Sequence, residues 1–446
     1  MIRRTWRFKP AQILAVTFLS AIGLGTILLL MPFSMRDGHI SFIDALFRST
    51  SAVCVTGLVV QDTAAHFSSV GQIIILALFQ LGGLGIMTFS TLVLLVAGKS
   101  VSIKDRIIIQ EGFHHSGIEN VKGLIKRIFL YALSIELAGA LLFFLHWSKT
   151  VPFGKAVFHS VFHSISAFCN AGFTLFSDSF VSFQSDVWMN VILMLLIILG
   201  GLGFLVLHEC SKSLPAFLKK KRFQMSLHAK MVLSLTLILI FFSWGLLLVL
   251  EWNQGLAGMA FKDKILGSLF QVVTSRTAGF NTINLAAVSL PGAFFLILLM
   301  FIGASPGSTG GGVKTSTIGV ILAFLKSKIR ARETVSLFKR TLSQSLVLKA
   351  FTLVTLAIVI IGAASLGLFL VEPEFGMKEI LFEVFSAFGT VGLSLGITPK
   401  LGTIGKLILI VTMYMGRIGP LTLLYAFSRE KAFGRFEYVE ESVMIG

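Results

Sequence analysis

The hydrophobic positions of this chain fall into long runs, and most charged residues lie in the segments between them. A helix needs about 20 apolar residues to cross a bilayer, and eight runs reach that length. They cover residues 11–31, 71–97, 124–146, 187–207, 230–252, 293–325, 345–371 and 405–427. The pattern therefore predicts an all-α membrane protein with eight spans.

A shorter apolar stretch lies between each odd-numbered span and the next even-numbered one. The four read DALFRSTSAVCVTGL, AVFHSVFHSISAFCNAGF, ILGSLFQVVTSRTAGF and EILFEVFSAFGTVGL, and their glycines Gly57, Gly172, Gly279 and Gly392 recur about every 110 residues. A helix of about ten residues is too short to span. We expect four half-helices that enter from the outer side, turn at the glycine and return.

Because each unit holds two full spans and one re-entrant segment, all four units enter the membrane in the same direction. Such parallel repeats are related by an axis along the membrane normal. The sequence thus predicts four membrane-pore-membrane repeats around a central pore. We assign residues 1–98 to repeat 1, 99–210 to repeat 2, 211–327 to repeat 3 with an interrupted sixth span, and 328–446 to repeat 4 and the C-terminal tail.

Composition supports the membrane assignment, and charge sets the orientation. Of 446 residues only 13% are charged, and the mean hydropathy is +0.88, which excludes a water-soluble protein. The net charge of +17 would suit nucleic-acid binding, but the basic residues gather in alternate segments: the N-terminal leader, 99–127, 212–230, 326–349 and the tail. By the positive-inside rule, both termini are cytoplasmic in a multi-pass protein of the cell (plasma) membrane, with no nucleic-acid partner.

The glycine of each short stretch suits a ring of backbone carbonyls that replaces the water shell of a potassium ion. The C-terminal ends of the four half-helices would add partial negative charge at the same place. Ordinary helix packing is the alternative for any single loop, but four copies in register favour a filter. The predicted filter residues are Val55, Thr56, Gly57, Asn170, Ala171, Gly172, Thr277, Ala278, Gly279, Thr390, Val391 and Gly392.

The sixth predicted span is interrupted by ASPGSTGGGVKTST, whose glycines and Pro306 exclude a continuous helix. We expect an unwound loop buried beside the pore. A phosphate-binding loop is rejected, because Val313 separates the last glycine from Lys314 and no soluble strand precedes it. The GGLG segments at 82–85 and 200–203 lie inside apolar runs and indicate close helix contacts.

A few polar residues remain inside or beside the spans. Arg417, in the last span, is expected to face the pore and form a barrier to cations with the 303–312 loop, a structural ion pair being the alternative. Glu136 is interpreted as a hydrogen-bonding partner between helices. Arg276 is expected to cap carbonyls or pair with an acid rather than to repel cations. His159 and His163 are interpreted as packing residues, as are Cys54, Cys169 and Cys210.

The segments TSAVCVTGL, SAFCNAGF, TSRTAGFNT and SAFGTVGL resemble the filters of the Trk/Ktr/HKT superfamily of potassium transporters, over nearly the whole chain. The resemblance is strongest to the bacterial KtrB membrane subunits. It implies potassium as substrate, because Gly57 stands where sodium-permeable members have serine. It also implies an intramembrane gate, which we assign to Gly303, Ala304, Ser305, Pro306, Gly307, Ser308, Thr309, Gly310, Gly311, Gly312, Lys314 and Arg417.

The same resemblance implies a homodimer with one pore per protomer, a cytosolic nucleotide-binding (KtrA-like) regulatory ring and sodium as an activating ion. It implies no covalent cofactor, and no catalytic constellation is found in the sequence. Two alternatives stay open: a sodium-selective member with the same architecture, and a non-conducting membrane receptor.

Overall fold

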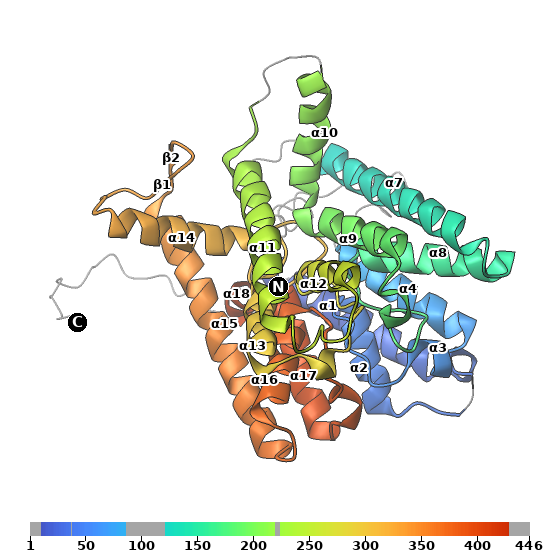
Figure 1. Cartoon of the computed structure of the whole chain (residues 1–446). Helices are drawn as coiled ribbons and strands as arrows, with labels where there is room; N and C mark the ends of the chain where they lie inside the picture. The colour runs from blue at the N-terminus through green and yellow to red at the C-terminus, as the bar shows by residue number, and fades with distance from the viewer. Residues whose placement is uncertain (1–9, 37, 86–120, 219–223, 428–446) are drawn as a thin grey trace, which may run out of the picture.

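The structure is a computed structural model that describes residues 10–36, 38–85, 121–218 and 224–427. Within these ranges the regular structure is helical apart from one two-strand hairpin, and turns and loops join the elements (Figure 1). The α-helices are α1 (Pro10–Leu30), α2 (Phe42–Val53), α3 (Thr63–His66), α4 (Ser69–Leu84), α7 (Val121–Trp147), α8 (Phe153–Phe168), α9 (Val187–Leu202), α10 (Phe204–Leu218), α11 (Leu227–Glu251), α12 (Phe261–Thr274), α13 (Leu290–Phe301), α14 (Thr315–Ile329), α15 (Gln344–Val371), α16 (Met377–Gly389), α17 (Thr403–Ile418) and α18 (Pro420–Phe427).

Short 3₁₀ turns and the hairpin join these helices. The turns are η1 (Pro32–Ser34), η2 (Val181–Phe183), η3 (Leu285–Ala287) and η4 (Thr398–Lys400). Strands β1 (Ser336–Leu337) and β2 (Arg340–Thr341) pair in antiparallel register, with Leu337 opposite Arg340.

Four long helices, α1, α7, α11 and α15, are apolar and long enough to cross a bilayer over Ala11–Leu30, Ile125–Trp147, Leu227–Glu251 and Gln344–Val371. Their outer faces carry exposed large apolar side chains, such as Leu137 on α7, Phe242 on α11 and Leu370 on α15. An isolated protein in water would not tolerate such faces, whereas lipid does. These helices are the first, third, fifth and seventh of the predicted spans.

The fourth and eighth predicted spans differ from the sequence prediction, because each contains a helix break within the described residues. The helix pair α9 and α10 is bent by 105° at Gly203, and α17 ends at Ile418 before Gly419. Both glycines have φ of 91°, a conformation that ends an α-helix and that side chains rarely adopt. Eight continuous spans are therefore not formed. The second predicted span is described only to Gly85, because residues 86–120 lie outside the described ranges.

The sixth span is interrupted as predicted. Helix α13 ends at Phe301 and α14 begins at Thr315, with the intervening residues in no helix. Gly303 N donates to Val313 O at 2.9 Å, so the segment is a closed loop whose two ends lie side by side.

Four short, largely buried helices, α2, α8, α12 and α16, lie between the long ones and follow a common packing pattern. Each packs on the long helix that precedes it. Each also contacts the helix that completes the previous predicted unit: α8 contacts α4, α12 contacts α9, and α16 contacts α13. The series closes because α2 contacts α17, from the other end of the chain. The short helices thus form a closed ring.

Close approach of glycine to backbone joins a short helix to the next helix of the same predicted unit at three equivalent places: α2 to α4, α8 to α9 and α16 to α17. A Cβ at Gly82, Gly200 or Gly416 would collide with the carbonyl oxygen of Val53, Phe168 or Phe388, respectively. Each of these carbonyls lies at the C-terminal end of a short helix. The GGLG segments therefore do make close contacts, but Gly85 and Gly203 end their helices rather than lie within them.

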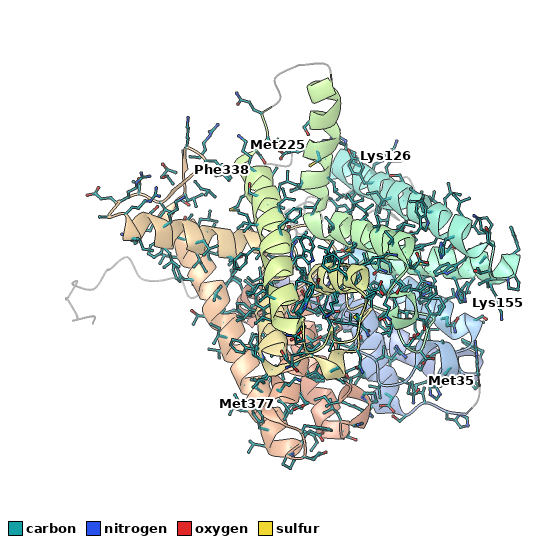
Figure 2. The ribbon with its side chains drawn as sticks, in the orientation of Figure 1. Met35, Lys126, Lys155, Met225, Phe338 and Met377 are labelled. Carbon is teal, nitrogen blue, oxygen red and sulfur yellow. The ribbon has the colours of Figure 1, made fainter. Side chains whose placement is uncertain are left out.

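The connecting segments that the charge pattern assigns to opposite sides of the membrane lie toward opposite ends of the molecule. Figure 2 places Lys126, Met225 and Phe338 toward one end and Met35 and Met377 at the opposite end. Of the predicted unit boundaries, 98/99 lies outside the described residues, while 210/211 and 327/328 fall inside α10 and α14. The basic leader, most of 99–127 and the C-terminal tail also lie outside the described ranges.

The glycine contacts yield a prediction of stability. Gly200→Ala should destabilise the protein by about 1–3 kcal/mol, the usual cost of overpacking, because the new methyl group meets the Phe168 carbonyl. Gly245→Ala on α11 is the matched control, since no atom lies within 4 Å of its added Cβ. The unfolding midpoint in detergent should fall for the first variant and stay or rise for the second. Equal midpoints would show that the ring tolerates expansion at this contact.

Candidate functional site

The four predicted filter segments share one backbone conformation. The first residue of each tripeptide has positive φ although it is not glycine: Val55 (58°), Asn170 (56°), Thr277 (78°) and Thr390 (49°). The third residue is the glycine, with φ of 90°, 72°, 82° and 92° in chain order. Positive φ costs a non-glycine residue about 1–3 kcal/mol and persists only where the surroundings impose it. We call residues 55–57, 170–172, 277–279 and 390–392 the glycine tripeptides.

The four glycines meet in a closed ring. A Cβ on Gly57 would lie 2.6 Å from Ala171 O, one on Gly172 would lie 3.0 Å from Ala278 O, and one on Gly279 would lie 2.5 Å from Val391 O. A Cβ on Gly392 would meet Thr56 O and close the circuit. Each glycine therefore packs against the carbonyl that precedes the next glycine. No side chain fits at this level, so the ring is lined by backbone atoms.

A hydroxyl group near the end of each short helix holds its tripeptide in this shape. Ser51 Oγ donates to Leu58 O at 2.8 Å and accepts from Gly57 N at 3.1 Å. Ser166 and Thr274 donate in the same way to Phe173 O and Phe280 O, each at 2.7 Å, and Ser386 Oγ accepts from Gly392 N at 3.1 Å. These hydroxyls satisfy backbone groups that a tight turn leaves unpaired.

The 303–312 loop lies directly against the glycine tripeptides. Cβ atoms added to Gly310 and Gly311 would meet the side chains of Thr277 and Thr390, and one on Gly312 would lie 3.2 Å from Gly389 Cα. The loop also bonds to the break between α9 and α10: Ser305 N donates to Gly201 O at 3.0 Å, and Phe204 N donates to Gly307 O at 2.9 Å. It is thus part of a buried hydrogen-bonded layer under the ring.

Arg417 connects this loop to the first unit. Its Nη1 donates to Thr309 O in the loop, and its Nη2 donates to Gly82 O at the end of α4. Lys314 Nζ donates to Gly310 O at 2.7 Å. Neither cation forms an ion pair with an acid among the described residues, which disfavours the structural ion pair as an account of Arg417. Two positive charges are therefore held beside the ring by carbonyl oxygens alone.

Arg417 also occupies a position that is glycine elsewhere in the chain. The ends of helices α4, α9 and α17 read Gly82-Gly83-Leu84-Gly85, Gly200-Gly201-Leu202-Gly203 and Gly416-Arg417-Ile418-Gly419. All three end in a glycine with φ between 85° and 91°. The arginine thus stands where units 1 and 2 have their second glycine, which makes unit 4 chemically different at this point.

Glu136 is a hydrogen-bonding partner between helices, as predicted. Both carboxylate oxygens of this buried residue accept from Gln80 Nε2 of α4, at 3.0 and 3.1 Å. The Cys169 thiol, which ends α8, donates to Gln80 Oε1 at 3.0 Å. All three cysteines are free. Glu136 and Gln80 therefore join α7, α4 and the second tripeptide.

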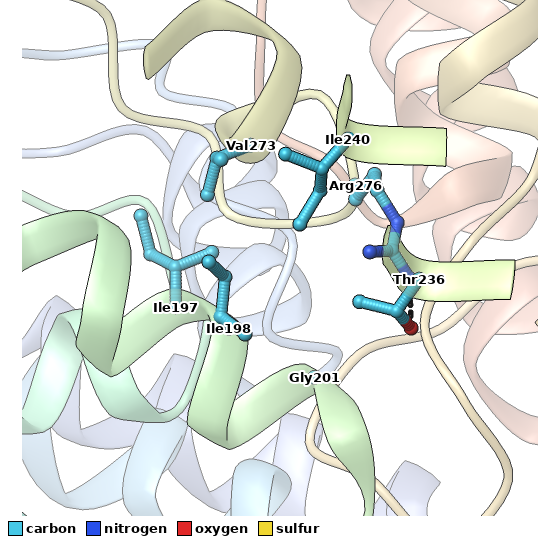
Figure 3. Close-up of a pocket in the computed structure, with 7 residues that line it drawn as sticks. All are labelled: Ile197, Ile198, Gly201, Thr236, Ile240, Val273 and Arg276. Atoms are coloured by element: carbon cyan, nitrogen blue, oxygen red, sulfur yellow. Dashed lines mark hydrogen bonds between the residues drawn. The ribbon is translucent and has the colours of Figure 1, made fainter. Parts of the chain in front are cut away.

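Arg276 differs from its expected role. Among the described residues it neither caps a carbonyl nor pairs with an acid; its Nη2 donates to Thr236 Oγ1 at 3.4 Å, and Nε has no partner. Figure 3 shows it beside Thr236 of α11, lining a cavity with Ile197 and Ile198 of α9. The side chain lies among residues of α9, α11 and α12. The cavity, of about 10 Å³, is at the lower limit for one water.

His159 and His163 pack as predicted. The His163 ring stacks on Phe176 with centroids 5.0 Å apart and lies 5.3 Å from Trp147, and Trp147 also contacts His159. Among the described residues, no group of three or more His, Cys, Asp or Glu side chains could hold a metal ion. The two histidines are part of an aromatic cluster.

Sequence reasoning missed three features of the site: the loop hydroxyls, the positive φ that precedes each glycine by two residues, and the helix breaks. The hydroxyls had a readable signal, because Ser51, Ser166 and Ser386 each stand six residues before their glycine and Thr274 five before. Pro420 was a signal for the break at Gly419, since the residue before proline avoids helical geometry.

Apolar helices whose outer faces require lipid, arranged around a ring of backbone loops, define a multi-pass membrane protein with its polar structure in the centre. Comparison with known proteins identifies the class further. Residues 7–436 match the family model TrkH, described as cation transport protein. The chain belongs to this family, which is one of transporters and not of enzymes.

Several relatives are similar over their full length. The chain is 39% identical to Ktr system potassium uptake protein B of Bacillus subtilis over 99% of this chain and 97% of that protein. It is 38% identical to potassium/sodium uptake protein NtpJ of Enterococcus hirae, covering 99% and 98%. Among solved structures, the potassium transporter TrkH of Vibrio parahaemolyticus matches with a TM-score of 0.75 at 22% identity, covering 96% of this chain and 86% of that one, and it supports the fold.

Proposed function

We propose that this protein takes up potassium across the cell membrane through the ring formed by the glycine tripeptides. The observation that carries the proposal is the closed circuit of Gly57, Gly172, Gly279 and Gly392, each packed on the carbonyl before the next. Alternating backbone conformations along a tripeptide turn its carbonyls toward one side, and a ring of carbonyls replaces the hydration shell of potassium. Proteins named for potassium uptake are 39% and 38% identical to this chain.

The architecture that we propose for this function is four parallel membrane-pore-membrane repeats, at 1–98, 99–210, 211–327 and 328–446. Three observations support it: the four long helices, the cyclic contacts of the short helices and the shared φ pattern of the tripeptides. The opposite ends at which the connecting segments lie (Figure 2) support cytoplasmic termini.

Sodium selectivity is the second candidate. A relative of 38% identity is named a potassium/sodium uptake protein, which supports sodium as a second candidate ion. Potassium is favoured here because all four positions of the ring are glycine, which leaves only backbone oxygens to select the ion. We propose sodium as an activating ion and no covalently bound cofactor.

The gate that we propose is the loop of residues 303–312 with Lys314 and Arg417. The loop lies against Thr277 and Thr390, the first residues of two tripeptides. Arg417 spans from the loop to Gly82, so movement of either element would break its hydrogen bonds. The two cations raise the electrostatic energy of a potassium ion at this level, and displacement of the loop would remove both the steric and the electrostatic barrier.

We propose that the protein works as a homodimer with a KtrA-like cytosolic nucleotide-binding ring. Relatives that carry the Ktr system name support a multi-component system. The β1–β2 hairpin offers an attachment point: Phe338 and Lys339 both have positive φ, 48° and 63°, and Phe338 is exposed at the tip, away from the helical body (Figure 2).

Uptake measurements test the proposal directly. Purified protein reconstituted in vesicles should accumulate radioactive rubidium, and excess potassium should compete much more strongly than sodium. Protein-free vesicles and an inverted ion gradient are the controls. Stronger competition by sodium would make the second candidate correct, and the absence of any uptake by folded protein would refute transport.

The ring itself is tested by Gly57→Ser. The serine side chain would need φ of 90° and would place Cβ 2.6 Å from Ala171 O, so the carbonyl ring must expand. Discrimination against sodium should fall about tenfold, a change of about 1.4 kcal/mol that is within the range of such backbone strain. Competition assays measure it, with Gly38→Ala, in an exposed turn with no neighbours, as the control. Unchanged selectivity would place this loop outside the ion path.

The gate is tested by Arg417→Ala. A unit charge about 10 Å from an ion costs roughly 1.7 kcal/mol at an effective dielectric constant of about 20, so its removal should raise the initial uptake rate about tenfold. Arg417→Lys keeps the charge and should stay near the original rate. A rate that is unchanged or lower in folded Arg417→Ala protein would rule out the barrier.

A further inference from the structure

One position of the four short helices carries a buried polar side chain of a different kind in each unit. Three residues before the loop hydroxyl stand Arg48, His163, Gln271 and Glu383. Arg48 is 2% exposed and the other three are fully buried. Polar groups at this depth are costly unless they are hydrogen-bonded, so each requires an explanation that packing alone does not supply.

Arg48, on the short helix α2, is hydrogen-bonded to the segment that follows the first tripeptide. Its Nη1 donates to Thr63 Oγ1 at 3.1 Å, and its Nη2 donates to Gln61 O. The guanidinium carbon also lies 5.4 Å from the ring centroid of Phe173, the residue directly after the second tripeptide. One side chain thus connects two neighbouring members of the ring.

His163 and Glu383 make the corresponding links in units 2 and 4. His163 Nε2 accepts from Leu175 N at 3.1 Å, three residues beyond Gly172, while Nδ1 donates to His159 O at 2.8 Å. Glu383 accepts from Thr398 Oγ1, which lies 3.1 Å from Ser394 Oγ, two residues beyond Gly392. In three of the four predicted units, therefore, the side chain at this position is hydrogen-bonded to the segment that follows the glycine in sequence.

The third unit lacks the link. Neither the oxygen nor the nitrogen of the Gln271 amide has a hydrogen-bond partner among the described residues. The narrow space beside it is lined mainly by apolar residues such as Leu256, Ile283 and Val288; Glu251 and Ser268 also line it, but neither is hydrogen-bonded to the Gln271 amide. The chain thus contains an internal comparison, with three linked units and one unlinked unit at the same helix position.

We infer that Arg48, His163 and Glu383 are positioning residues for ion selection, each acting through the segment that follows its filter glycine. The inference rests on the proposed function of the ring. Each tripeptide holds two residues at positive φ, a shape that relaxes unless it is fixed at both ends. The loop hydroxyl fixes the glycine or the residue directly after it, and this side chain fixes the segment that follows, so that the carbonyls keep the spacing that suits potassium.

Substitution of the hydroxyl residues that bond to Glu383 and Arg48 tests the inference with the least disturbance of the fold. Thr398→Val and Thr63→Val remove one hydroxyl each at nearly constant volume, and Glu383→Leu removes the other partner of the Thr398 link. Loss of one hydrogen bond corresponds to about a 2- to 10-fold change in an equilibrium. The sodium concentration that halves rubidium uptake should therefore fall about 2- to 10-fold in each. Glu383→Leu combined with Thr398→Val should add little to either single change.

Gln271→Leu is the matched control, because it alters the same position where no link exists, and its sodium competition should equal that of the unmodified protein. The inference is overturned if Thr398→Val and Thr63→Val protein transports rubidium with unaltered sodium competition, or if Gln271→Leu shifts it as far. Absence of rubidium uptake by the unmodified protein would instead refute the proposed function. If Glu383→Leu protein does not accumulate, Thr398→Val alone decides the unit 4 link.

Discussion

The structure depends on keeping irregular backbone satisfied at membrane depth. Unpaired peptide groups cost several kcal/mol each in hydrocarbon, and this chain carries four non-helical tripeptides, two helix breaks at Gly203 and Gly419, and an unwound loop in its centre. Loop hydroxyls such as Ser51, carbonyls exposed by the breaks, and the Arg417 guanidinium supply the partners. The long apolar helices surround this layer and separate it from lipid.

The helix breaks and the 303–312 loop supply hydrogen-bond partners to each other. A helix that stops at Gly203 exposes the carbonyls of Gly200 and Gly201, and the 303–312 loop donates to both. The loop in turn exposes the carbonyl of Thr309, which accepts from Arg417. Each irregular segment thus satisfies its neighbour, which is why an element as glycine-rich as the loop is ordered beside the ring.

Likeness and difference among the four units have separate consequences. The tripeptides share positive φ at their first and third residues and their closed packing, as the proposed ion-binding ring requires. The residues behind and below them differ: Arg48, His163, Gln271 and Glu383 occupy one position, and Arg417 replaces a glycine. Similar tripeptides can therefore share one packed ring while the side chains behind them differ, three of them hydrogen-bonded to the segment after the glycine and Gln271 without a partner among the described residues.

Periodicity and hydropathy alone determined the class of protein, the four short helices with the glycines that follow them, and the interruption of the sixth span, because these depend on residue type and local spacing. Tertiary structure decided the rest. Gly203 ends a helix through a φ value that hydropathy does not record, Arg276 bonds to Thr236 from another helix, and Gly57 meets Ala171 from another unit. Such contacts join residues more than 35 positions apart, and only the folded chain brings them within bonding distance.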